Sequence, residues 1–100
     1  MLNDGGNHVF DREQQAVQEL MKVDGPDDAA AQDVIDLVVE ADRQLALTAL
    51  FEAIAGDGSA SRIAKAADEI ALAEAAADDG DFDKAVSHYK KAWQESIKAL

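Results

Sequence analysis

The sequence predicts an all-α protein, folded as a mostly antiparallel bundle of four helices. Apolar residues recur at three- and four-residue steps along four segments, which is the spacing of one helix face. The chain contains one proline, and no segment alternates apolar and polar residues as a half-buried strand does. Alanine, the strongest helix former, supplies much of the apolar content of 48%. A chain of 100 residues is large enough for one core, so we expect a single domain over residues 9–100.

The first helix is predicted over about residues 10–23. Its apolar stripe is expected to contain Phe10, Val17 and Met21. The preceding residues 1–8 are polar and rich in glycine, so we expect a flexible tail there. The run Asp24-Gly25-Pro26 is expected to end the helix, because glycine and proline both interrupt helical pairing.

The second helix is predicted over about residues 26–55, with Pro26 at its first position. Its apolar residues form two stripes on nearly opposite sides. One stripe contains Val34, Val38, Ala41 and Leu45, and the other contains Leu47, Leu50, Phe51 and Ile54. We expect the second stripe to lie inside the bundle. The stripe with Val34 and Val38 is expected to face the first helix. The alternatives are that the second helix is kinked near residues 42–45, or that one stripe is an oligomer interface.

The third helix is predicted over about residues 59–77, after the turn Gly56-Asp57-Gly58-Ser59. Its buried side is expected to contain Ile63, Ala67, Ile70 and Ala77. Asp78-Asp79-Gly80 is expected to end it, because glycine readily adopts the left-handed conformation that follows a helix.

The fourth helix is predicted over about residues 81–99, with Asp81 as its N-cap. Its apolar stripe is unbroken and contains Phe82, Ala85, Val86, Tyr89, Ala92, Trp93, Ser96, Ile97 and Leu100. Tyr89 and Trp93 lie one turn apart and offer the largest packing surfaces of the chain. We expect them to anchor the core; the alternative is that one of them lines a ligand groove.

Composition and charge restrict the function classes. Twenty-one acidic residues against nine basic ones give a net charge of −12, which disfavours binding to nucleic acid and to anionic membranes. The absence of cysteine excludes disulfides and thiolate metal sites. No apolar run is long enough to span a membrane, and residues 1–10 do not resemble a signal peptide. Acidic residues concentrate in residues 24–57, whereas residues 81–100 carry a slight basic excess.

No pattern for catalysis, cofactor binding or metal binding is complete. The aspartates at 79, 81 and 83 alternate as in a calcium loop, but Lys84 and Lys90 replace the required glycine and glutamate. His8 and His88 belong to no Glu-x-x-His motif, so a di-metal centre is not supported, and a haem held by Met21 and His88 is not favoured either. No serine lies in a nucleophile elbow, and no phosphate-binding glycine loop precedes a helix. We therefore predict no catalytic, cofactor-binding or metal-binding residues.

Two resemblances come from the second half of the chain. Residues 66–100 resemble one tetratricopeptide hairpin, with Leu72-Ala73 as the large-then-small pair. The second-helix pattern of that motif is matched by Gly80, Phe82, Ala85, Tyr89 and Ala92. Residues 34–100 are similar to a helical domain near the C-termini of large secreted or surface-attached microbial proteins. The marks of that resemblance are Ala41-Asp42-Arg43, Ile63-Ala64-Lys65-Ala66, Gly80-Asp81-Phe82-Asp83-Lys84-Ala85 and His88-Tyr89-Lys90-Lys91-Ala92-Trp93.

The second resemblance implies an accessory module outside the cell, without catalytic activity. The expected function is therefore a non-catalytic helical interaction or spacer module within a larger extracellular protein. The alternative is a tetratricopeptide-like domain that binds a peptide or protein. In either case the expected partner is a protein or a neighbouring domain, and a homodimer is a further possibility. The expected contact residues are Tyr89, Trp93, Val34, Val38 and Leu45.

Overall fold

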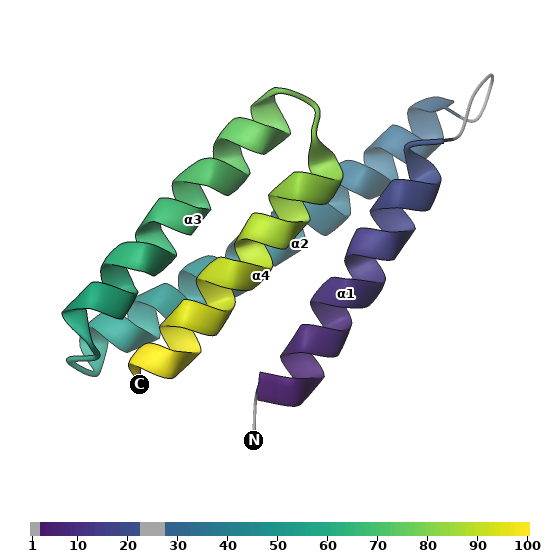
Figure 1. Ribbon diagram of the computed structural model, residues 1–100. Coiled ribbons are helices and arrows are strands. Elements are labelled where there is room, and N and C mark those ends of the chain that lie inside the picture. The colour runs from purple at the N-terminus through teal and green to yellow at the C-terminus, as the bar shows by residue number, and fades with distance from the viewer. Residues whose placement is uncertain (1–2, 23–27) are drawn as a thin grey trace.

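The computed structural model describes residues 3–22 and 28–100 and confirms the all-α fold class. It contains four helices within these residues: α1 (Asn3–Leu20), α2 (Asp28–Ala55), α3 (Ala60–Asp78) and α4 (Phe82–Ala99). Successive helices run in opposite directions, so the bundle is mostly antiparallel (Figure 1). Across the described residues no strand is present.

Helix α4 is the centre of the bundle, because it contacts α1, α2 and α3. In Figure 1, α3 and α1 lie on either side of α4, and α2 passes behind it. Among the described residues α1 and α3 do not contact each other. The bundle is therefore flattened, with principal extents of 49 × 26 × 15 Å.

Helix α1 extends further toward the N-terminus than the sequence indicates. It begins at Asn3, so residues 3–8, which were expected to form a tail, belong to the helix, and it ends at Leu20 rather than near residue 23. Adding a turn to an existing helix is much less costly than starting one, and this offsets the low propensity of two glycines. The predicted stop at Asp24-Gly25-Pro26, and the expected start of the second helix at Pro26, lie outside the described residues.

The core follows the stripe of α4, as predicted. Tyr89 and Trp93 are 1% and 8% exposed, and the Trp93 ring lies 5.9 Å from the ring of Phe10, tilted by 49°. Both are therefore core anchors. The other buried residues of α4 are Ala85, Val86, Ala92, Ser96 and Ala99. Phe10 and Val17 are buried residues of α1, whereas Met21 is exposed.

The buried side of α2 differs from the predicted one. It contains Ala31, Ile35, Val39, Asp42, Ala46, Ala49, Leu50 and Ala53. Leu50 lies inside as expected and Leu47 is half-buried, but the expectation for Phe51 and Ile54 is wrong, because both are exposed. Small alanines allow helices to approach closely, so the inner side is marked by alanine and not by the largest apolar residues. The helix is uninterrupted through residues 42–45.

Helices α3 and α4 form a hairpin joined by a short turn at residues 79–81. Ile70 of α3 is buried as expected, but Ala67 is exposed, and the buried positions beside it are Ala66 and Ala73. Gly80 follows α3 with φ of 81°, in the left-handed region that was predicted. Asp81 occupies the N-cap position of α4, although its side chain makes no capping hydrogen bond.

Candidate interaction surface and a buried acidic pair

A groove of about 510 Å³ lies between α2 and α4. Its lining residues are Ala41, Gln44, Leu45, Thr48, Ala49, Glu52, Trp93 and Ile97. The floor is apolar because Trp93 and Ile97 come from the stripe of α4, and Glu52 is the one charged residue among those that line it. Of the two aromatic residues expected at a partner-binding groove, Trp93 lines this groove and Tyr89 does not.

An exposed apolar surface continues from this groove along α2. We call it the α2 strip and define it as Val34, Leu37, Val38, Ala41 and Leu45. These residues fall within about 100° of one another around the helix and extend for about 17 Å along it. Val34 and Leu45 are each 44% exposed, Leu37 is 71% exposed, and Val38 is half-buried. The four residues predicted on this stripe therefore lie on one surface, and Leu37 joins them.

Acidic side chains line one edge of the α2 strip. Asp33, Asp36 and Glu40 are exposed and lie next to Leu37 around the helix. We call these three residues the acidic row. Gln32 Nε2 donates to Asp36 Oδ1 at 2.8 Å, and Gln44 Nε2 donates to Glu40 Oε2 at 2.8 Å. These amide contacts orient the carboxylates of Asp36 and Glu40 without neutralising them; of the three, Glu40 also pairs with a base, Arg43.

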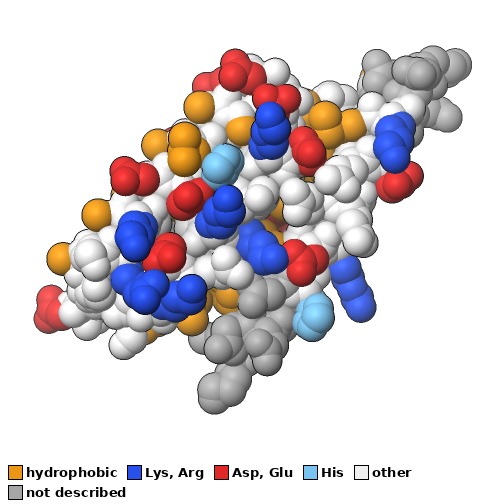
Figure 2. All heavy atoms as spheres, in the orientation of Figure 1, with side chains coloured by type: hydrophobic (Ala, Val, Ile, Leu, Met, Phe, Trp, Pro, Cys, Tyr) orange, Lys and Arg blue, Asp and Glu red, His pale blue; other side chains and the backbone are white. Residues whose placement is uncertain are grey.

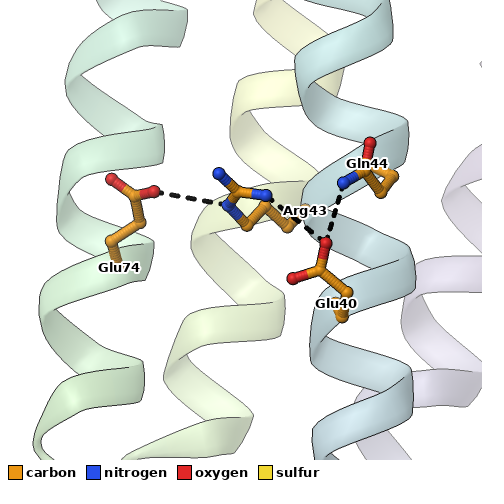
Figure 3. A network of polar contacts seen from close by, with 4 residues as sticks. All are labelled: Glu40, Arg43, Gln44 and Glu74. Carbon is orange, nitrogen blue, oxygen red and sulfur yellow. Dashed lines mark hydrogen bonds and ion pairs between the residues drawn. The ribbon is translucent and has the colours of Figure 1, made fainter.

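Arg43 is directed from α2 toward α3 (Figure 3). Its Nε donates to Glu74 Oε2 at 3.4 Å, and its Nη1 donates to Glu40 Oε2 at 3.3 Å. Hydrogen bonding to Glu74, with the charge of Glu40, raises the pKa of Arg43. Arg43 is the single base among residues 24–57. Because one cation serves two carboxylates, the α2 surface keeps a negative excess.

Two acidic groups are buried against each other between α1 and α2. Asp42 is 0% exposed, and neither of its carboxyl oxygens has a hydrogen-bond donor among the described residues; the same is true of Glu13 Oε1. Burial, followed by the hydrogen bond and the charge of Glu13, raises the pKa of Asp42 from 3.8 to about 9. Two carboxyl groups can share a hydrogen bond only if one is protonated. The raised pKa therefore favours the protonated form of Asp42 at neutral pH.

Sequence reasoning missed this pair. Asp42 was counted only among the acidic residues of 24–57, yet it lies three and four residues from Val39 and Ala46, in register with the inner side of α2. That register is the signal that could have revealed it. Ser96, placed correctly on the stripe of α4, is 0% exposed and its Oγ has no hydrogen-bond partner among the described residues.

The opposite face of the molecule carries mixed charges. Figure 2 shows this face, formed by α1, α3 and α4, with basic and acidic side chains interspersed. His88 Nδ1 lies 2.7 Å from Glu69 Oε2, Arg62 Nη1 lies 3.0 Å from Glu95 Oε2, and Lys90 also pairs with an acid, Asp11. Such pairs at the surface contribute little stability each, but they leave this face without a charge excess of one sign.

Within the described residues, no three His, Cys, Asp or Glu side chains gather closely enough to hold a metal ion. Nor does any described helix have the length and apolar character needed to cross a membrane. Comparison of the chain with protein-family models, with curated proteins and with solved structures gives no match.

Proposed function

We propose that this chain is a non-catalytic helical interaction module that binds a protein partner through the α2 strip and the adjoining groove. The observation that supports this most strongly is that α2 keeps large apolar side chains on its outer side while alanines fill half of its inner side. Ala46, Ala49 and Ala53 occupy its core side, whereas Leu37 and Leu45 point to solvent. Burying a leucine stabilises a fold by about 1.5 to 3 kcal/mol. An arrangement that keeps leucines outside is explained if a partner covers them.

The exposed apolar residues of the α2 strip are contiguous, and this distinguishes them from single exposed residues such as Leu72. Single exposed leucines are normal in proteins, but a continuous apolar surface marks an interaction site. Here Val34, Leu37 and Leu45 follow one side of the helix and lead into a groove with Trp93 at its base. A ligand of protein size can contact both parts at once.

The accessory role within a larger extracellular protein rests on the resemblance of residues 34–100 and on the acidic composition. The tetratricopeptide-like alternative is favoured by one observation, the position of Trp93 in the groove between α2 and α4. Both readings place the partner on the same surface. A homodimer would also use it, and Val38→Glu would then yield a folded monomer in sedimentation experiments.

The proposal is tested with a synthetic amphipathic helix that carries neutral glutamine on its polar side and lacks tryptophan. Trp93 is the single tryptophan of the chain, so its fluorescence reports occupation of the groove. We expect saturable binding that Leu37→Ser weakens. Leu72→Ser is the matched control, because Leu72 is an exposed leucine on α3. Failure of neutral, basic and acidic helices alike to bind, in a chain that stays monomeric, would refute the proposed function.

A further inference from the structure

The charge pattern beside the α2 strip restricts the kind of partner, provided that the proposed function holds. A helix packs on another helix through apolar residues at three- and four-residue steps, and residues at the edges of that contact meet side by side. The strip has the width and periodicity for such a contact. One of its edges is the acidic row, Asp33, Asp36 and Glu40, and all three carboxylates are exposed.

A second copy of this chain fits this pattern poorly. A two-fold axis that pairs α2 with α2 in antiparallel orientation places the same edge of each helix opposite itself, so acidic row faces acidic row. A parallel two-fold pair instead turns the acidic row toward the partner's groove, whose one charged lining residue is Glu52. Like charges at an interface are unfavourable in both cases, and two chains of net charge −12 repel each other at long range as well.

A basic partner meets none of these costs. Lysine or arginine along one edge of a docked helix would lie opposite the acidic row, while its apolar stripe covers Leu37 and Leu45. The excess negative charge of the chain would also increase the rate of encounter with a cation. We propose that the partner of the α2 strip is an amphipathic helix with lysine or arginine along the edge that faces Asp33, Asp36 and Glu40.

The experiment compares synthetic helices of about 18 residues, long enough at 1.5 Å per residue to cover the strip. All share one leucine and alanine stripe and lack tryptophan; their edge positions carry lysine, glutamine or glutamate. Binding is followed by the fluorescence of Trp93 and, independently, by calorimetry. We expect the lysine helix to bind about five- to tenfold more tightly than the glutamine helix, the effect of three exposed ion pairs. The glutamate helix should bind more weakly than both, and added salt should reduce the differences.

A matched pair of variants tests whether the acidic row itself is responsible. The triple variant Asp33→Asn, Asp36→Asn, Glu40→Gln removes three charges from the row, and Asp68→Asn, Asp78→Asn, Asp79→Asn removes three exposed charges elsewhere. Both have the same net charge, and circular dichroism checks that both remain helical. Only the first should remove the preference for the lysine helix.

The outcomes separate this inference from the proposed function. Equal binding of all three helices overturns the basic partner and leaves the interaction module standing. Equal loss of preference in both triple variants also overturns it, because net charge alone would then explain the effect. Sedimentation that shows a dimer disrupted by Leu37→Ser would identify a second copy as the occupant and overturn it too.

Discussion

Replacement of Asp42 by asparagine should stabilise the protein at neutral and alkaline pH, by an amount that grows with pH. The two residues have nearly the same shape, so packing is preserved. Asparagine carries no charge at any pH. Its amide N–H can donate to Glu13, which lies beside position 42 and whose buried Oε1 has no hydrogen-bond donor in the wild-type protein. The variant therefore removes a buried ionisable group and supplies a hydrogen bond.

The direction of the pH dependence follows from the shifted pKa. The pKa of Asp42 is about 9 in the folded protein, against 3.8 for the free side chain. Between these values the folded state holds a proton that the unfolded state has released. The free energy of unfolding therefore falls as pH rises through this window, by about 1.4 kcal/mol per pH unit for one full proton. Between about pH 5 and about pH 8 the free energy of unfolding of the wild type can therefore fall by at most about 4 kcal/mol through this one group.

The measurement is denaturant unfolding of wild type and Asp42→Asn at several pH values. The difference in free energy of unfolding between the two proteins is the relevant quantity, because the titration of the other acids largely cancels in it. This difference should increase in favour of the variant between about pH 5 and about pH 8. Asp68→Asn removes an exposed acid and should stay within about 0.5 kcal/mol of wild type throughout. A difference for Asp42→Asn that does not change with pH would refute the protonated acidic pair.

Three further predictions concern the core, one turn and metal binding. Trp93→Ala should lower the free energy of unfolding by about 3 to 5 kcal/mol, because it removes a buried ring packed on Phe10; a melting curve like that of wild type would contradict this. Gly58→Ala should destabilise by about 1 to 3 kcal/mol, since the new Cβ would lie 2.8 Å from the carbonyl oxygen of Ala99, whereas Gly80→Ala would be limited by its backbone angle alone. Helicity and melting temperature should be equal with chelator and with calcium at matched ionic strength, and a saturable stabilisation by calcium would show that the aspartates around the start of α4 bind it.

The sequence was sufficient for the fold class and for the anchor of the core. The stripe that contains Tyr89 and Trp93 is strongly periodic, and its interpretation did not depend on neighbouring helices. Helix α2 was harder because half of its inner side is alanine, which carries little hydrophobic signal. The larger residues Phe51 and Ile54 therefore dominated the pattern although they face outward.

The candidate site could be predicted only in part, because the sequence shows the spacing of residues along a helix but not what covers them. Val34, Val38 and Leu45 could be placed on one stripe from their spacing, but the exposure of that stripe depends on how far the short α1 covers α2. The acidic pair was not found because an aspartate among many others looks like a surface charge. The burial of Asp42 depends on tertiary packing, in which α1 covers α2 and brings Glu13 next to it.

The central position of α4 has a consequence for the order in which the bundle assembles. Helix α4, which completes the core, follows the other three helices along the chain. Its contacts with α1 join distant parts of the chain, since Lys90 and Asp11 are 79 residues apart. The α3–α4 hairpin can close early, because only a short turn separates its helices, whereas closing the loop to α1 carries a larger entropic cost. During synthesis, the apolar sides of α1 and α2 that α4 covers in the folded domain therefore stay exposed until α4 has formed.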